Sequence, residues 1–159
     1  MTISREEGIA AAGTPELLER VGMVTRGEEF HRSSPLSDPP AFRELASRLA
    51  GAVEEVYDLF VVRDLFGDRV LGYQLSLITG KPLAISYDRE GIIVLESGET
   101  LERGSRALVV ADVHFTVQSI WAAASGVEQA GMQVAGAAIL LRVVREEYPF
   151  PVWTLEDRS

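Results

Sequence analysis

Residues 106–141, RALVVADVHFTVQSIWAAASGVEQAGMQVAGAAILL, decide the fold. The stretch opens with an apolar run at 107–111, which is typical of a strand buried on both faces of a sheet. Apolar residues then recur at helical spacing over 120–127, and Gly131 marks the end of that helix. A second apolar run at 133–141 predicts another buried strand. A strand, a helix and a strand in this order predict a parallel sheet covered by helices.

The same pattern occurs once more, upstream. The run DLFVV at 58–62 predicts a buried strand, and RDLFGD at 63–68 predicts a turn. Helical spacing of leucine and isoleucine side chains predicts a helix over 69–79, and PLAIS at 82–86 predicts the next strand. Residues 89–106 lie between the two strand–helix–strand segments and predict a small antiparallel hairpin.

The flanking parts of the chain contain helix and strand signals of their own. A helix is expected to begin at Thr14, where threonine can cap and Pro15 fits the first turn. Asp38 precedes a second helix, whose apolar positions run from Phe42 to Val56. The polar connection between the two helices predicts at most a short strand, and the tail predicts an edge strand.

Together these elements predict an α/β fold with a mainly parallel central sheet flanked by helices. We expect a single domain over 1–159, since this length suits one hydrophobic core. Within it, residues 1–40 are expected to form a small N-terminal cap region, 41–145 the core, and 146–159 a C-terminal tail.

Composition excludes several classes of function. The chain has no cysteine, which rules out disulfides and thiolate metal sites. Its net charge is −9 with Lys81 as the only lysine, and such a surface repels nucleic acid. No apolar run reaches the ~20 residues of a membrane span, and the acidic N-terminus does not resemble a signal peptide. We therefore expect a cytoplasmic protein that binds neither nucleic acid nor membrane, whereas a small anionic ligand stays compatible with the charge.

A ligand site is expected at one edge of the sheet. Ligands of parallel sheets bind beyond the carboxyl ends of the strands. Three predicted loops lie there, at 63–68, 87–91 and 112–119. The third is a strand-to-helix turn, a common phosphate-binding geometry, but it contains no glycine.

These segments resemble the type I phosphoribosyltransferases. The stretch at 106–141 is similar to their signature strand, acids, phosphate loop and helix. DLFVVRDLFGDRVLGYQLSLITGKPLAIS looks like their strand, pyrophosphate loop, helix and Gly-Lys-Pro entry into the next strand. PELLERVGMVTRGEEFHRSSPLSDPPAFRELASRLAG is similar to the N-terminal region of the orotate and adenine branches. The resemblance covers roughly residues 14–142 and implies a phosphoribosyltransferase-like fold and a homodimer.

The resemblance assigns ribose and phosphate binding to the signature region. Of the two acids that hold the ribose of phosphoribosyl pyrophosphate in the family, only Asp112 remains, because Ala111 replaces the other. The loop amides would hold the 5′-phosphate, and their positions in this chain are Thr116, Val117, Gln118 and Ser119. Valine and glutamine stand where the family has glycines, and Phe115 replaces the acid that assists the base in some members.

The other two loops also depart from the family. The pyrophosphate loop corresponds to Arg63, Asp64, Gly67 and Asp68. Its two carboxylates repel pyrophosphate unless Mg²⁺, which the resemblance implies as cofactor, or an arginine intervenes. The long lid of the family is missing, which leaves Tyr87 and Arg89 as base or lid residues.

Simpler explanations compete with each of these roles. Asp112 could be an acid that merely precedes a helix, and Thr116 and Ser119 could be helix caps. Asp64 and Asp68 could be solvated loop residues. For His114 and His31 a packed or solvent-facing position is favoured over an acid–base role, and the two do not form a metal constellation. For Trp121 we favour a subunit interface over core packing or ligand stacking.

Two functions follow from the resemblance. The first is a phosphoribosyltransferase-related protein of nucleotide or nucleobase metabolism, whose altered loops leave the transferase activity weak or lost. The second is a non-catalytic homodimer of the same descent that binds a nucleotide, another phosphate compound or a protein. No residue is assigned to catalysis itself, and no metal-ligand set is assigned to the chain.

Overall fold

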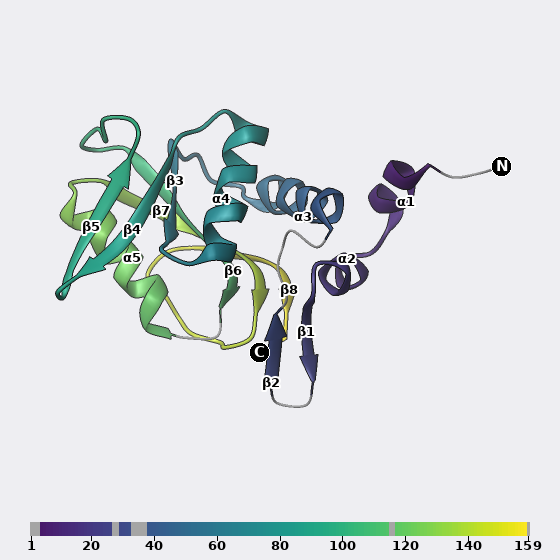
Figure 1. Ribbon diagram of the computed structural model, residues 1–159. Coiled ribbons are helices and arrows are strands. Elements are labelled where there is room, and N and C mark those ends of the chain that lie inside the picture. The colour runs from purple at the N-terminus through teal and green to yellow at the C-terminus, as the bar shows by residue number, and fades with distance from the viewer. Residues whose placement is uncertain (1–3, 27–28, 33–37, 115–116, 159) are drawn as a thin grey trace.

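A computed structural model describes residues 4–26, 29–32, 38–114 and 117–158, without the side chains of 24–26, 29–32 and 117–119. Its centre is a six-stranded sheet in the order β5-β4-β3-β6-β7-β8 (Figure 1). The strands of this sheet are β3 Leu59–Arg63, β4 Leu83–Arg89, β5 Ile92–Ser97, β6 Arg106–His114, β7 Gln133–Arg142 and β8 Val152–Asp157.

Four of the five strand pairings in this sheet are parallel, and only β4 and β5 run antiparallel. The two central strands are apolar and buried along nearly their whole length, because helices cover both faces. The predicted α/β class with a mainly parallel sheet is confirmed. The tail adds β8 beside β7, so the predicted edge strand is also confirmed.

Helices α3 Pro39–Ala52 and α4 Phe66–Thr79 pack on one face of the sheet, and α5 Val117–Gln129 packs on the other (Figure 1). The larger hydrophobic cluster lies under α3 and α4, and two smaller clusters lie under α5. Asp38 caps α3, since its side chain accepts the backbone N–H of Ala41. Among the described residues, no helix is long and apolar enough to cross a bilayer.

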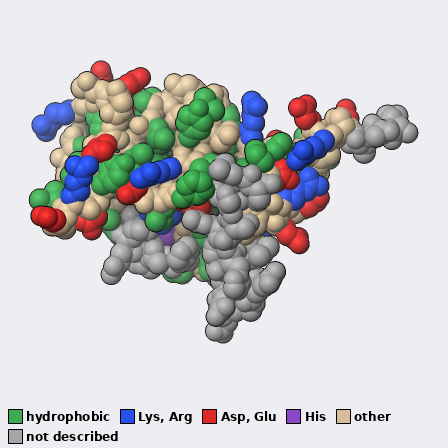
Figure 2. Space-filling model, viewed as in Figure 1, with side chains coloured by type: hydrophobic (Ala, Val, Ile, Leu, Met, Phe, Trp, Pro, Cys, Tyr) green, Lys and Arg blue, Asp and Glu red, His purple; other side chains and the backbone are tan. Residues whose placement is uncertain are grey.

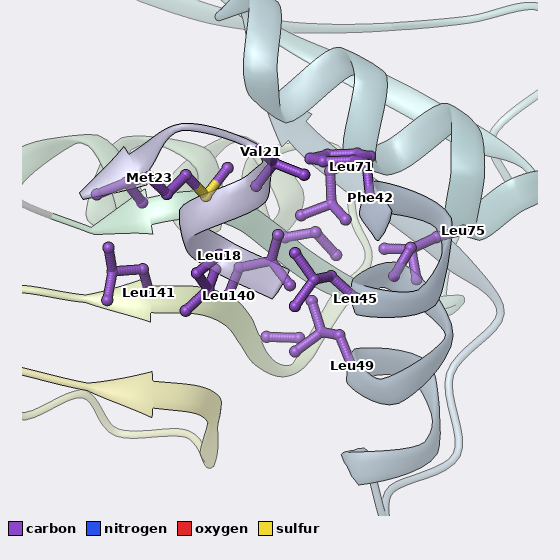
Figure 3. Packing of buried hydrophobic residues seen from close by; sticks show 14 of the residues in the cluster. Leu18, Val21, Met23, Phe42, Leu45, Leu49, Leu71, Leu75, Leu140 and Leu141 are labelled. Carbon is purple, nitrogen blue, oxygen red and sulfur yellow. The ribbon is translucent and has the colours of Figure 1, made fainter. Parts of the chain in front are cut away.

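The N-terminal region packs against this framework through its own helices, α1 Arg5–Ala11 and α2 Thr14–Arg20. A two-stranded antiparallel sheet, β1 Met23–Arg26 with β2 Glu29–Arg32, follows them. Leu18, Val21 and Met23 are fully buried against α3 and β7 (Figure 3). These contacts join the N-terminal region to the main hydrophobic core, whereas the boundaries at 40 and 145 stay predictions.

Some predicted details of the N-terminal half are confirmed and others are wrong. Helix α2 begins at Thr14 as expected, but its N-cap is Gly13, and the hydroxyl of Thr14 accepts a hydrogen bond from Arg48 instead. Helix α1 was not predicted, although Ser4 and Glu7 form a capping box at its start. Helix α3 ends at Ala52, so Val56 lies outside it and is 75% exposed.

The three connections at the carboxyl edge are shorter than predicted. Helix α4 begins at Phe66, so Gly67 and Asp68 are helical and not part of a turn. Strand β6 continues through Asp112 to His114. The antiparallel pair is formed by β4 and β5, not within 89–106, and its tight turn uses Glu90 and Gly91 at positive φ.

Candidate functional site

Three charged residues meet at the carboxyl edge of the sheet. Arg63 is the last residue of β3, and Asp112 lies near the end of the neighbouring parallel strand β6. Asp68 lies in the first turn of α4, which starts three residues after β3 ends. Parallel pairing therefore brings two of the predicted loops together, and the short connection adds the start of α4.

The guanidinium of Arg63 and the carboxylate of Asp68 form a two-point ion pair. Arg63 Nε donates to Asp68 Oδ2 at 2.6 Å, and Nη2 donates to Oδ1 at 3.0 Å. Nη2 also donates to the carbonyl of Val113 at 3.0 Å. Asp68 Oδ1 in turn accepts the backbone N–H of Asp112 at 3.0 Å. The pair thus connects β3, α4 and β6.

The third charge, Asp112, is also turned inward. Its Oδ1 accepts the backbone N–H of Val113 at 2.7 Å and lies 3.9 Å from Arg63 Nη2. Asp68 and Asp112 are 0% exposed and Arg63 is 7% exposed. Burial alone would lower the pKa of Arg63, but the hydrogen bond and charge of Asp68, together with the charge of Asp112, outweigh it and raise the pKa. We call Arg63, Asp68 and Asp112 the edge cluster.

The remaining predicted residues of the first two loops lie apart from the edge cluster. Asp64 pairs with Arg69, and both side chains are nearly half exposed. Arg89 pairs with Glu96 on the β4–β5 hairpin. Both arginines lie near the ring of Tyr87, whose centroid is 5.9 Å from Arg69 Cζ and 5.6 Å from Arg89 Cζ. This surface offers cations and a ring rather than carboxylates alone.

The acids at this edge do not form a metal site of their own. Asp64 and Asp68 each bind an arginine and lie in different surroundings, one exposed and one buried. Within the described ranges, no three histidine or acidic residues are grouped closely enough to hold a metal ion. The described residues at this edge therefore do not fit an Mg²⁺ held by protein side chains alone.

A second group of residues, which the sequence did not reveal as a unit, lies beside the edge cluster. His114 is 0% exposed, and its Nε2 lies 2.9 Å from the hydroxyl of Tyr148 in the connection between β7 and β8. The rings of Tyr148 and Phe150 stack at 5.1 Å. Trp121 of α5 lies 5.3 Å from Tyr148, and its Nε1 donates to Glu146 at 3.1 Å. The prediction treated 146–150 only as a tail.

Burial controls the ionisation of this second group. It lowers the pKa of His114, with further lowering from the charges of Arg63 and Arg142. It also raises the pKa of Tyr148, with further raising from the carboxylate of Glu146. The imidazole is therefore neutral and the phenol protonated near pH 7, which suits the contact between them. His114 is a packed histidine, one of the two alternatives favoured over an acid–base role.

The predicted phosphate loop is only partly described. Phe115 and Thr116 lie outside the described residues, as does the side chain of His31. Val117, Gln118 and Ser119 form the first turn of α5, of which the structure describes the backbone. The strand-to-helix arrangement expected for a phosphate site is therefore present on both sides of 115–116.

The curated relatives of this chain are orotate phosphoribosyltransferases, although no family model matches it. It is 32% identical over 99 residues to an orotate phosphoribosyltransferase of Pelotomaculum thermopropionicum, which covers 62% of the chain and 50% of that relative. An orotate phosphoribosyltransferase of Sphingopyxis alaskensis is 31% identical over 97 residues. The chain spans about half the length of the curated relatives it matches.

Solved structures of the same group match nearly the whole chain. Adenine phosphoribosyltransferase from Thermoanaerobacter pseudethanolicus superposes with a TM-score of 0.72 at 22% identity, covering 90% of this chain and 98% of the other. Orotate phosphoribosyltransferase from Mycobacterium tuberculosis, solved with inorganic phosphate, gives 0.73 at 16% identity, covering 99% and 95%. The resemblance seen in the sequence is confirmed, and this chain has the fold of the type I phosphoribosyltransferases.

Proposed function

We propose that this chain is a phosphoribosyltransferase-related protein of nucleotide metabolism that binds a phosphorylated ribose compound and has weak or no transferase activity. The edge cluster carries the proposal. It occupies the edge where the resemblance assigns the pyrophosphate to 63–68 and the ribose to Asp112. Each of these assignments is a prediction from the resemblance.

The charges of the cluster oppose the binding of pyrophosphate. The guanidinium of Arg63, a cation within the predicted pyrophosphate loop, already donates two hydrogen bonds to Asp68. Asp68 and Asp64 then add negative charge on either side of the turn into α4. Any Mg²⁺ that enters would have to arrive bound to the phosphates of the ligand, a common way for this ion to bind.

The burial of Asp112 opposes catalysis as well. Its carboxylate is fully buried and 3.9 Å from Arg63, so it must turn outward before it can accept ribose hydroxyls. Transfer of a ribosyl group depends on positioning and on electrostatic stabilisation of the transition state, and both weaken when the charged groups bind one another instead.

Calorimetric titration tests this proposal directly. The ligands are phosphoribosyl pyrophosphate with Mg²⁺, a panel of nucleoside monophosphates and inorganic phosphate, and turnover is assayed with orotate and adenine. We expect heat from at least one nucleoside monophosphate and a turnover far below that of an active transferase. Efficient turnover with either base would contradict the loss of activity, and the absence of heat from every ligand would contradict ligand binding.

Two variants make the titration specific to the site. Asp112→Asn is expected to change the affinity for the ribose compound, because it removes the only remaining signature acid. Glu99→Gln is the control, since Glu99 is exposed near the amino ends of the strands, beside Asp58 and Pro82. Equal affinities in the two variants would show that Asp112 does not take part in binding.

The second candidate function is a non-catalytic homodimer that uses the same fold for nucleotide, phosphate or protein binding. An exposed apolar helix face on α4 favours the dimeric part of this candidate. Sedimentation of the wild-type chain, with and without a nucleoside monophosphate, separates assembly from ligand binding. A monomeric chain that binds nucleotide would contradict the homodimer of this candidate but not its ligand binding.

A further inference from the structure

The connection between β7 and β8, residues 143–151, contacts His114 at the end of β6. We call this connection the strap. Two backbone N–H groups at its start donate to the carbonyl of His114, at 2.9 and 3.1 Å. Further along, the hydroxyl of Tyr148 lies 2.9 Å from the imidazole Nε2. His114 precedes the predicted phosphate-binding residues 116–119 by two positions, so the strap is attached close to where they begin.

The strap also contacts Trp121 of α5, which follows the same predicted residues by two positions. The indole ring lies 5.3 Å from the ring of Tyr148 and 6.3 Å from that of Phe150, and its Nε1 donates to Glu146 at 3.1 Å. The strap therefore contacts the chain both before and after 116–119. A change in its position would change the surroundings of the predicted phosphate site.

The surroundings of the His114 imidazole oppose its protonation. The side chain is fully buried, and Nδ1 has no hydrogen-bond partner among the described residues. Burial lowers the pKa of His114, and the charges of Arg63 on β3 and Arg142 on β7 lower it further. The backbone of Val144 and the carboxylate of Glu146, both in the strap, act in the opposite direction without reversing the shift.

Three more side chains complete these surroundings. The hydroxyl of Tyr148 stays protonated, because burial and the carboxylate of Glu146 raise its pKa. On the α5 side, the ring contact to the strap is made by Trp121, which carries no charge. On β6 itself, the carboxylate of Asp112 lies beside Arg63.

Protonation would give the imidazole a second N–H donor and a positive charge. Nδ1 would then carry an N–H that no described group accepts at hydrogen-bond distance, in a site where Arg63 and Arg142 already contribute positive charge. A buried donor without an acceptor and an added buried charge both cost free energy. Both costs disappear when the ring turns into water, and this movement separates Nε2 from Tyr148.

We propose that the strap is a pH-sensitive latch beside the predicted phosphate site, closed while His114 is neutral and opened when His114 takes up a proton. The latch belongs to the fold of this chain. It goes beyond the proposed function, and it does not depend on which ligand the site binds or on whether the chain catalyses a reaction.

Both ends of the strap are held by bonds that do not involve the imidazole. At its start, Arg142 donates to the carbonyls of Val144 and Glu146. At its end, the carbonyl of Pro151 accepts the backbone N–H of Ala137 at 2.9 Å. Opening is therefore expected to be confined to the middle of the strap, which carries Tyr148.

The emission of Trp121, measured on the full chain between pH 7.5 and pH 5, tests the latch. Opening removes the rings of Tyr148 and Phe150 from the indole, so the emission should move to longer wavelength. The equilibrium constant for opening is expected to rise about tenfold for each pH unit below about 6.5, until the lower pKa of the closed state is reached. Trp153, the other tryptophan, is measured alone in Trp121→Phe.

Few other groups titrate in this range. The charged side chains on the surface are arginine, lysine and carboxylates (Figure 2), which keep most of their charge between pH 7.5 and pH 5. The chain has two histidines, His31 and His114. His31→Gln is therefore the matched control, and it is expected to follow the wild type.

Two variants make the result specific to the latch. His114→Gln places an amide near the position of Nε2 but cannot take up a proton, so its emission is expected to stay constant with pH. Tyr148→Phe keeps the packed ring and loses the hydroxyl that contacts His114. Because its closed strap is less stable, its transition is expected at a higher pH than that of the wild type.

Circular dichroism over the same pH range shows whether the fold stays intact. The proposal is overturned by constant Trp121 emission in the wild type, by the same transition in His114→Gln, or by a transition that coincides with loss of the dichroism signal. A transition at the wild-type pH in Tyr148→Phe would contradict the role of the hydroxyl in closing the strap. These outcomes are independent of the ligand titrations that test the proposed function.

Discussion

Arg63 and Asp68 form a buried two-point ion pair, with Nε 2.6 Å from Oδ2 and Nη2 3.0 Å from Oδ1. Side-by-side hydrogen bonds of this kind fix the orientation of both side chains. Because Asp68 also accepts the backbone N–H of Asp112, the pair holds the start of α4 against the ends of β3 and β6. The same contact gives this edge its shape and occupies a cation that the proposed phosphate ligand would otherwise attract.

The pair is expected to dominate the stability of this edge. Asp68→Ala leaves the guanidinium of Arg63 buried beside Asp112 alone, and loss of one partner of a buried pair costs about 3–5 kcal/mol. Urea unfolding should therefore show a clear decrease in midpoint. The double variant Arg63→Met/Asp68→Leu should lose less than the sum of the two single changes, since it leaves neither charge without its partner.

The neighbouring exposed pair supplies the control for that experiment. Asp64 and Arg69 are 42% and 46% exposed in their side chains, and such pairs contribute only about 0–1 kcal/mol. Asp64→Ala should therefore leave the unfolding midpoint nearly unchanged. If it cost as much as Asp68→Ala, the burial of the edge cluster would not be the source of its contribution.

Periodicity predicted the sheet and its helices, but not where the polar residues point. The apolar runs at 58–62, 107–111 and 133–141 are all strands, because burial on both faces requires continuous apolar sequence. The sequence places Asp68 in the predicted turn at 63–68, where a solvated loop residue is the simpler explanation for it. Only the structure shows that Arg63, five residues earlier in the chain, pairs with Asp68 and makes the burial of this carboxylate possible.

The contacts of the tail were beyond prediction for a related reason. Tyr148 reaches His114 across 34 residues of sequence, and no local pattern signals such a pairing. The proline-rich composition of 145–151 is typical of a loop, which it is. What the sequence does not show is that this loop folds back over the end of β6. The phosphate loop stays a prediction, since 115–116 lie outside the described residues.

His114 is expected to make the protein sensitive to mild acid. Its pKa is lowered by burial and by Arg63 and Arg142, with opposing influence from Glu146. In the unfolded chain, His114 therefore takes up a proton near pH 6.5, whereas in the folded chain it stays neutral until the pH is lower. The stability linked to this histidine is present above pH 6.5 and is lost as the pH falls from there through the lower pKa of the folded state.

Thermal or urea unfolding between pH 7.5 and pH 5 measures this effect. The wild type should lose more free energy of unfolding over that range than His114→Gln, which has no imidazole to protonate at this position. His31→Gln gives the comparison for the only other histidine of the chain. Parallel pH profiles for wild type and His114→Gln would show that His114 titrates normally in the folded protein.

Gly72 permits the close approach of α4 to the sheet. A Cβ at this position would lie 2.8 Å from Leu83 Cδ1 and 2.8 Å from Val62 Cγ1. Gly72→Ala is therefore expected to destabilise the fold by about 1–3 kcal/mol, as overpacking of a core does. Gly51→Ala is the matched helical control, because nothing lies within 4 Å of its Cβ position and alanine favours a helix. A stabilised Gly72→Ala would mean that α4 moves away from the sheet at little cost.

Trp121 is expected to hold the loop between β7 and β8 in place. Its ring lies 5.3 Å from that of Tyr148 and 6.3 Å from that of Phe150, and its Nε1 donates to Glu146. Trp121→Ala removes all three contacts, so hydrogen exchange at 146–150 should become faster, whereas Trp121→Phe should keep most of the protection. Because these contacts lie within one chain, neither variant should change the oligomeric state. Loss of the dimer in Trp121→Ala would instead assign Trp121 to a subunit interface.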